Sequence, residues 1–339
     1  MSTEKSTPVI GEWYTITPEG AKNSEGGSWS GHIRIGTENK VIVYFYGGGV
    51  STDEYTASHG FYSRTSDFDP AETPGITNSD PANPFHNWTV ISVPYSTGDF
   101  HAGNAEFPYT DTDGQKKILY HNGYINYSGL MCEAVKFIPK PDVLLVAGSS
   151  AGGFAAAILC DDVISNYFPD VKNTLMLCDS GMLRMKNWRY YAEHVWHMPE
   201  SIYSCINSDN GSLDCIVALN RKYGDKVKIL FTSSVRDSTM CDYQAYYDGK
   251  QYDDKADSAD VFYDFLKGLV YDLIREVPDI GLFIWGDIPE NDPRALTYHT
   301  VICFKDFYTK IQPCGYRVCD WLLDAIDGKV EKLGLEMLK

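Results

Sequence analysis

Ser150 is the residue of this chain whose surroundings best suit covalent chemistry. It stands in Gly148-Ser149-Ser150-Ala151-Gly152, which fits the pattern G-x-S-x-G, and the apolar run 143–147 precedes it. In that pattern the serine occupies a sharp turn between a strand and a helix, and the glycines leave room for the tight backbone. Glycine and serine are common, so an ordinary turn is the competing interpretation. The apolar run before the motif and the helical pattern after it favour a nucleophilic serine.

A serine hydroxyl is a poor nucleophile until a neighbouring base takes its proton, and an acid must hold that base in orientation. In the architecture that uses this serine turn, the acid and then the base follow the serine along the chain. His194 and His197 precede the next predicted strand, whereas His299 follows the last one. We therefore predict that His299 is the base.

The acid has three candidates, each placed near the end of a predicted strand. Asp237 comes just after the apolar run 228–233, Asp242 lies five residues further on, and Asp179 follows the preceding strand. Aspartate is abundant in this acidic chain, so position alone does not exclude a surface role. Asp237 fits the expected order best, and Asp242 and Asp179 remain alternatives.

The glycine triplet at 47–49 directly follows the apolar and aromatic run 40–46. A flexible turn is one interpretation. The other is that glycine lets backbone N–H groups point into a cavity, as in the loop that supplies half of an oxyanion hole. We expect Gly48 and Ala151 to donate such groups, with Gly47 as a further candidate. Ser150 would attack an ester carbonyl and water would cleave the acyl-enzyme, a reaction that needs neither a metal nor an organic cofactor.

The elements that must position these residues alternate between strand and helix patterns from 41 to 285. Such alternation predicts an α/β fold, in which a mostly parallel central sheet lies between two helical layers. Ligands of such sheets bind beyond the carboxyl ends of the strands, where the segments at 47, 150 and 237 all lie. This is the three-layer sandwich of the α/β-hydrolase type. We expect one domain, 1–339, with cap insertions at about 184–224 and 243–280.

Composition narrows the function classes. The formal charge of −17 argues against nucleic acid and anionic membrane surfaces as partners, since both attract clustered Lys and Arg. The first residues contain no basic segment followed by an apolar run, so no secretory signal is visible. Nine cysteines without tight pairs are typical of reduced thiols. These features favour a cytoplasmic protein, and they do not specify an oligomeric state.

Several further motifs are similar to those of a known family. They include 44–49, the block 83–88 that leads to 94–95, the Gly-Asp-x-His-x-Gly sequence at 98–103, the serine turn at 148–153 and Asp-Ser-Gly at 179–181. Together these segments resemble the pectin acetylesterases and the related Notum-type carboxylesterases over nearly the whole chain. The resemblance implies a triad of Ser150, Asp237 and His299, with an oxyanion hole made by Gly47, Gly48 and Ala151.

The resemblance also implies a substrate class. Secreted members carry disulfide cysteines where this chain has Val50-Ser51 and Ser96, which suits an intracellular, bacterial-like member. We therefore expect an acetylesterase acting on acetylated oligosaccharides derived from pectin or xylan. Trp188, Tyr190 and Trp196 are candidates for stacking on sugar rings, although the same aromatic pattern fits a core. The alternatives are a carboxylesterase for longer acyl or lipid esters and an inactive binding module of the same fold.

Overall fold

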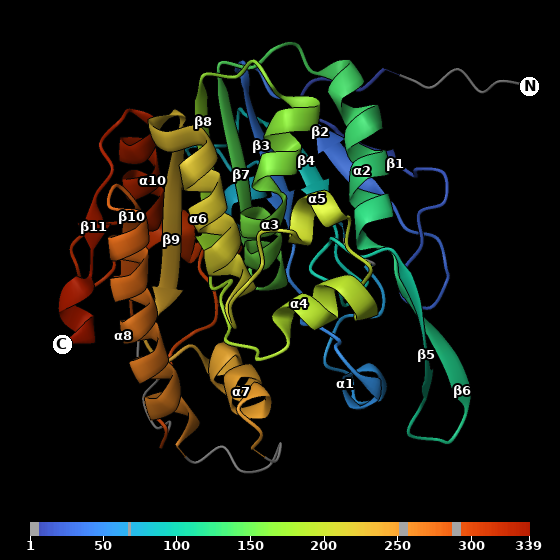
Figure 1. The fold of residues 1–339 in the computed structure, drawn as a ribbon. Coiled ribbons are helices and arrows are strands. Elements are labelled where there is room, and N and C mark those ends of the chain that lie inside the picture. The colour runs from blue at the N-terminus through green and yellow to red at the C-terminus, as the bar shows by residue number, and fades with distance from the viewer. Residues whose placement is uncertain (1–6, 67–68, 251–256, 287–292) are drawn as a thin grey trace, which may run out of the picture.

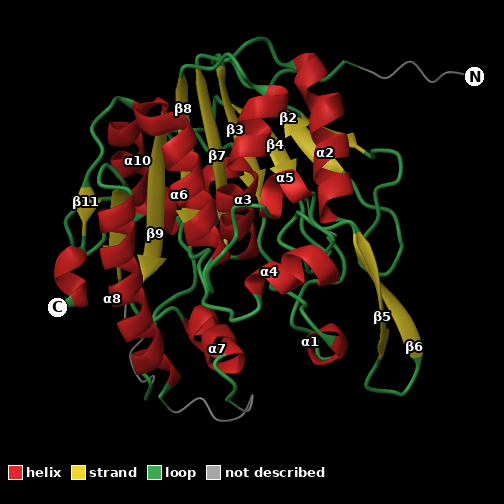
Figure 2. Ribbon diagram, in the orientation of Figure 1, coloured by secondary structure: helices red, strands yellow, loops and turns green. Residues whose placement is uncertain are grey.

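The protein is a sheet covered by helices on both faces, as the computed structural model shows in Figures 1 and 2. The structure describes residues 7–66, 69–250, 257–286 and 293–339. Nine strands of the described chain form the central sheet in the order β1-β2-β4-β3-β7-β8-β9-β10-β11. Their bounds are, in that order, Trp13–Ile16, Gly31–Arg34, Thr89–Val93, Lys40–Phe45, Val143–Ser149, Asn173–Asp179, Val227–Ser234, Gly281–Trp285 and Lys332–Leu333.

The sheet is largely parallel, with antiparallel strands at one edge. From β4 to β11 every pair of neighbours runs parallel. At that edge, β1 pairs with β2 and β2 pairs with β4 in antiparallel register. The segments 13–16 and 31–34 thus form an antiparallel pair near the N-terminus, and this pair joins the central sheet.

The parallel strands are buried on both faces because their side chains alternate between two cores. In β3, Val41, Val43 and Phe45 contact one core, and Ile42 and Tyr44 contact the other. The first core lies under α2, α3, α6 and α8, whose bounds are Gly123–Ala134, Ala151–Tyr167, Gly211–Tyr223 and Ser258–Glu276. The second lies under α10, Val318–Ile326, and the segment 76–88. Continuous apolar runs are what such doubly covered strands require.

The two predicted cap insertions contain helices of the sheet-covering layer. α6 and α8 bury Ile216, Leu219, Leu266 and Leu269 in the first core, against the sheet. An amphipathic helix with one apolar face needs such a partner surface. α4 (Trp188–Tyr190) in the first segment and α7 (Ser238–Tyr247), whose second half falls in the second segment, lie beyond the carboxyl ends of the parallel strands (Figure 1). Part of the second segment, 251–256, lies outside the described residues.

Two more elements lie at the same edge of the sheet. They are α1, Glu54–Ser58, and the hairpin of β5 (Ala105–Thr110) and β6 (Lys116–His121), which projects from the lower right in Figure 1. The carboxyl edge of the sheet is therefore the most elaborated part of the molecule. Within the described ranges, no helix has both the length and the apolar character needed to cross a bilayer.

Candidate active site

Ser150 occupies the strained turn that the sequence predicts. β7 ends at Ser149 and α3 begins at Ala151, so Ser150 is the single residue between them, with φ 57° and ψ −126°. A Cβ atom on Gly148 would lie 2.0 Å from the carbonyl oxygen of Gly152, and one on Gly152 would lie 1.9 Å from that of Phe45. Only glycine fits at either position. The spacing of the motif is thus dictated by close backbone packing, and it leaves Ser150 partly exposed.

His299 and Asp237 lie together, although 62 positions separate them in the sequence. The imidazole Nδ1 lies 2.7 and 2.8 Å from the two carboxylate oxygens of Asp237. Because a carboxylate only accepts, Nδ1 carries the proton and the lone pair of Nε2 is left available. Asp237 is fully buried and also accepts hydrogen bonds from the backbone N–H groups of Thr239 and Met240 as the N-cap of α7. This is the geometry of an acid that orients a base.

The electrostatics of the pair favour a protonated histidine. Burial of the ring opposes its charged form, but the carboxylate of Asp237 outweighs this effect, and the pKa of His299 lies above its ordinary value of 6.5. A raised pKa contributes stability that is complete below the unfolded value and is lost as the pH rises through the folded one. In the described part of the chain, Nε2 of His299 has no hydrogen-bond partner, Ser150 included. Such contacts are often loose in unliganded enzymes.

Asp179 connects the serine turn to the histidine segment. Its backbone carbonyl accepts a 2.8 Å hydrogen bond from the N–H of Ser150. Its carboxylate accepts 2.8 and 2.9 Å hydrogen bonds from the N–H groups of Val301 and Ile302, just beyond His299. Burial raises the pKa of Asp179 to about 6 in spite of these donors. Asp179 therefore serves as an anchor and does not contact the His299 ring as a hydrogen-bond partner.

The third candidate acid is engaged elsewhere. Asp242 lies on α7 and pairs with Arg294, at 3.2 Å between Nη1 and the carboxylate. Among the three aspartates named from the sequence, Asp237 is the one whose carboxylate is hydrogen-bonded to His299. Its assignment as the triad acid nevertheless remains a prediction.

The glycine triplet lies against the serine turn. A Cβ atom on Gly47 would lie 2.6 Å from both the Cβ of Ser150 and the carbonyl oxygen of Ser149. The backbone of Gly47 can approach the nucleophile candidate this closely only without a side chain. Ala151 opens α3, and the first N–H groups of a helix have no partner within it. Backbone from two segments therefore lies close to Ser150, and the role of the N–H groups of Gly47, Gly48 and Ala151 as an oxyanion hole stays a prediction.

Sequence reasoning gave no role to His101, although its motif was noted. His101 Nε2 lies 2.9 Å from the carbonyl oxygen of Tyr46. Burial lowers the pKa of His101 to about 4, so the ring is neutral and Nε2 donates. The Tyr46 carbonyl and the Gly47 N–H belong to one planar peptide unit, so this bond fixes the direction of the Gly47 N–H. The signal was available in the Gly-Asp-x-His-x-Gly motif.

Asp99 holds the backbone that carries His101. Its buried carboxylate accepts hydrogen bonds from Thr97 Oγ1 at 2.6 Å, from the Gly123 N–H at 2.8 Å and from the His101 N–H at 3.1 Å. Burial raises the pKa of Asp99 to about 6, against the effect of these donors. His101 itself has φ 61°, a left-handed conformation that needs such support.

Two of the three predicted sugar-stacking residues are core residues, which corrects that expectation. Trp188 and Trp196 are each 0% exposed, and both pack against Phe100 in the first core. Their ring faces are closed to a ligand in solution. Tyr190, at the end of α4, is 57% exposed. The aromatic pattern could not distinguish these cases, because core and surface aromatics at helical spacing look alike in sequence.

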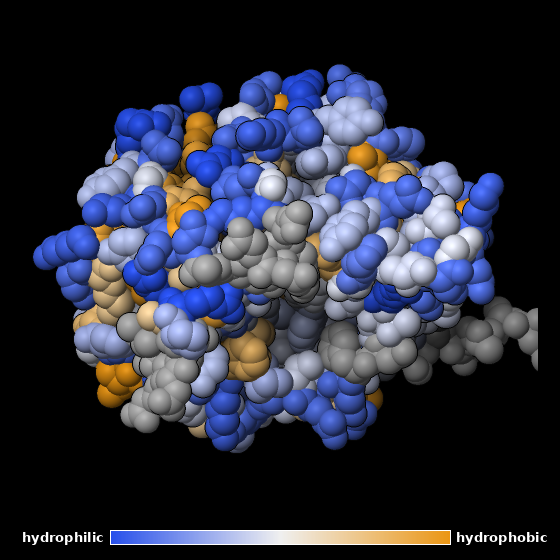
Figure 3. All heavy atoms as spheres, turned by 90° about the horizontal axis from the view of Figure 1, so that it is seen from below, coloured by the Kyte–Doolittle hydropathy of each residue, from blue (hydrophilic) through white to orange (hydrophobic). Residues whose placement is uncertain are grey.

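The site lies at the carboxyl edge of the sheet, on the face that Figure 3 shows from below. That face is mainly hydrophilic and is hollowed near its centre. In the described residues no group of three or more His, Cys, Asp or Glu side chains could hold a metal ion. A serine in a tight strand–helix turn and an Asp–His pair at this edge of the sheet place the protein in a class of α/β proteins, those with the architecture of ester hydrolases.

The chain belongs to the pectinacetylesterase family, whose model matches residues 22–251, more than half of the sequence. The family consists of hydrolases that act on esters. The fold is similar to that of the Wnt deacylase Notum from Drosophila in one crystal form, with a TM-score of 0.64, 17% identity and coverage of 95% of both chains. A second crystal form gives a TM-score of 0.62 and 15% identity, covering 94% of this chain and 96% of the other.

Replacing the acid partner should shift the titration of His299. In Asp237→Asn the carboxylate charge is lost while the ring stays buried, so we expect the pKa of His299 to fall below its wild-type value. NMR titration of the histidine ring signals measures this shift, with His299→Gln used to assign the resonance. Asp242→Asn is the matched control, because its carboxylate pairs with Arg294. An equal fall in both variants would contradict the assignment of Asp237.

Proposed function

We propose that this protein is a serine esterase that removes acetyl groups from acetylated carbohydrate, such as oligosaccharides derived from pectin or xylan. The observation that carries the proposal is the placement of Ser150 in a strained strand–helix turn at the sheet edge where Asp237 binds His299. Family membership supports ester hydrolysis independently. No cofactor takes part in the reaction that we propose.

In this mechanism the Ser150 hydroxyl attacks the acetyl carbonyl while Nε2 of His299 takes its proton. Asp237 stabilises the imidazolium that forms. The N–H groups of Gly47, Gly48 and Ala151 donate to the oxyanion, and the loss of one such donor typically costs about 3 kcal/mol of transition-state stabilisation. The protonated His299 then gives its proton to the departing sugar oxygen. Water cleaves the acetyl-enzyme in the second half, with His299 again as the base.

A polar cavity lined by the two residues that follow Asp237 supports a carbohydrate substrate. It has a volume of about 300 Å³ and is lined by Gly60, Phe61, Ser238, Thr239, Asp242, Tyr243 and Arg294. Aromatic rings beside hydroxyl and charged groups suit a sugar, which has apolar faces and a polar rim. The ion pair of Arg294 and Asp242 adds charged hydrogen-bonding groups to this lining.

A second cavity favours the alternative of a longer acyl chain. It has a volume of about 450 Å³ and flanks His299 through Tyr298 and Thr300, with Pro74, Trp285, Val301 and Phe304 among its lining residues. Most of these side chains are apolar, and an acyl chain gains about 0.8 kcal/mol for each CH2 group that it buries. The substrate class thus depends on which of the two cavities receives the acyl group.

The compartment is also a proposal. All nine cysteines of the chain are free thiols. This supports a reducing environment and hence a cytoplasmic enzyme that meets imported oligosaccharides. The substrates are then soluble esters, and neither nucleic acid nor membrane is a partner in this proposal.

Removal of the nucleophile should abolish the reaction. In Ser150→Ala we expect kcat for an aryl acetate to fall by at least about a thousandfold, because no acyl-enzyme can form. Ser165→Ala, at the exposed end of the same helix, serves as the control and should keep the wild-type rate. Thermal unfolding of both variants checks that the fold is intact. An unchanged rate in Ser150→Ala would refute the catalytic account.

Acyl length separates the two substrate classes. We expect kcat/KM to be highest for the acetate when acetate, butyrate and octanoate esters of one alcohol are compared, and acetate to be released from acetylated xylan or pectin oligosaccharides. A preference for octanoate would instead assign the apolar cavity to the acyl group. In that case Phe304→Ser should reduce octanoate hydrolysis more than acetate hydrolysis, since Phe304 lines that cavity.

His101 should act through the position of the Gly47 N–H. In His101→Asn, which tolerates a positive φ, the shorter side chain no longer reaches the Tyr46 carbonyl. We expect kcat to fall about tenfold or more with little change in KM, because oxyanion donors act mainly in the transition state. Steady-state kinetics with an aryl acetate measure both constants. A higher KM at an unchanged kcat would rule out this positioning role.

A further inference from the structure

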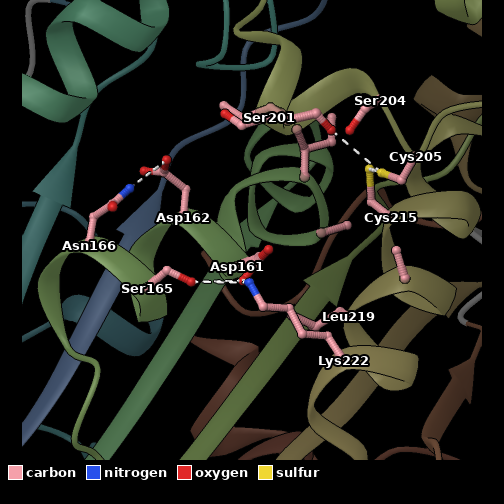
Figure 4. Close-up of a pocket in the computed structure, with 14 residues that line it drawn as sticks. Asp161, Asp162, Ser165, Asn166, Ser201, Ser204, Cys205, Cys215, Leu219 and Lys222 are labelled. Atoms are coloured by element: carbon pink, nitrogen blue, oxygen red, sulfur yellow. Dashed lines mark hydrogen bonds and ion pairs between the residues drawn. The ribbon is translucent and has the colours of Figure 1, made fainter.

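Two thiols meet at a surface cavity that the proposed esterase reaction does not use (Figure 4). Cys205 follows α5, Glu200–Tyr203, and Cys215 lies on α6. The cavity has a volume of about 400 Å³, and both cysteines line it together with Ser201, Ser204 and Asp161. In Figure 4 the two sulfur atoms point toward each other across one wall of the cavity.

The two sulfur atoms are close enough for covalent chemistry after a small movement. Their Sγ atoms lie 3.5 Å apart and share a hydrogen bond. A disulfide bond is about 2.05 Å long, so the side chains need to approach by only about 1.5 Å. Cys205 sits in a non-helical connection two residues beyond α5, where such a rotation disturbs no helix.

The two thiols differ in access and in acidity. Cys205 is partly exposed, whereas Cys215 is 5% exposed. The hydrogen bond from the Cys215 thiol lowers the pKa of Cys205, although burial opposes the shift. The same contact, together with burial, raises the pKa of Cys215. Since the thiolate is the reactive form, the accessible cysteine is also the better nucleophile.

We propose that Cys205 and Cys215 form a thiol–disulfide exchange site for a small polar disulfide such as oxidised glutathione. The Cys205 thiolate attacks one sulfur of the reagent, so a mixed disulfide forms and one glutathione thiolate leaves. The Cys215 thiol then loses its proton to solvent and its sulfur attacks the Sγ of Cys205, which releases the second glutathione. The protein loses two hydrogens, and one oxidised glutathione becomes two reduced molecules.

The cavity suits this reagent in size and chemistry. Besides the two cysteines, its wall presents the hydroxyl groups of Ser201 and Ser204 and the Lys222–Asp161 ion pair, which is 2.6 Å long. A zwitterionic peptide can pair with such groups. The product would tie the end of α5 to α6 across a short loop. Closing a loop of this length should raise the Tm by about 3 °C in a chain of this size.

The test is intact-protein mass spectrometry of the full chain after incubation with oxidised glutathione, followed by peptide mapping. In the wild type, peptide mapping should find a 205–215 cross-linked peptide that has lost two hydrogens, and no glutathione at either of these two cysteines. In Cys215→Ser the reaction should stop halfway, with one glutathione retained at residue 205. In Cys205→Ser, residue 215 should stay unmodified, because Cys215 is buried and has a raised pKa.

Exposed Cys132 is the internal control, because we expect it to accept glutathione, and no thiol of the described residues is hydrogen-bonded to it. It should retain the adduct in the wild type and in both variants, and Cys132→Ser should leave the 205–215 cross-link unchanged. A glutathione adduct that persists at residue 205 in the wild type would overturn the proposal. So would modification of Cys215 in Cys205→Ser, or a cross-link yield no higher than that of a random cysteine pair.

Discussion

The site depends on the hydrogen bonds that the carboxylate and the backbone carbonyl of Asp179 accept. The carbonyl holds the N–H of Ser150, and the carboxylate holds the backbone that follows His299. The serine turn and the segment after His299, about 150 positions apart in the sequence, are thereby both held at the end of β8. Burying a carboxylate is costly unless N–H donors compensate it, and here two such donors offset part of the cost, since the pKa of Asp179 is still raised to about 6. Ser150 is thus held through its backbone N–H, and His299 through the backbone that follows it and through the hydrogen bond of its ring to Asp237.

Several residues with strained backbone conformations lie at the carboxyl edge of the sheet. Phe100, His101, Ser150, Ser180 and Thr300 all have positive φ values between 52° and 62°. Each such residue costs of order 1–3 kcal/mol and persists only where its surroundings over-determine it. Asp99 and Asp179 stabilise these conformations through buried hydrogen bonds to the backbone. The strained residues flank the glycine loop, the serine turn and the histidine segment, which are the three parts that the proposed reaction brings together.

Sequence could predict those features that have a local signature. The serine turn and the glycine triplet follow apolar strands, and the chain order selected His299 and favoured Asp237. The antiparallel pairing of β2 with β4 could not be predicted, because the residues of one strand do not indicate which distant strand it pairs with. The motif at 98–103 marks Asp99 and His101 but does not reveal their roles, since their partners include backbone groups such as the Tyr46 carbonyl. Side-chain types predict chemistry, but they do not say which main-chain atom a buried side chain binds.

The buried tryptophans explain why the segment after β8 is aromatic. Phe100 stacks on Phe154 of α3, with ring centroids 4.2 Å apart, and Trp188 stacks on Phe100. Trp196 then donates a 2.7 Å hydrogen bond to the carbonyl of Ser51, just past the glycine triplet. These rings join the first turn of the elbow helix to the loop of His101 and to the glycine loop. All of these rings are fully buried, and close-packed side chains transmit a displacement to their neighbours. The aromatic part of the segment 184–224, which we expected from sequence to form a cap, therefore connects the elements that position the site.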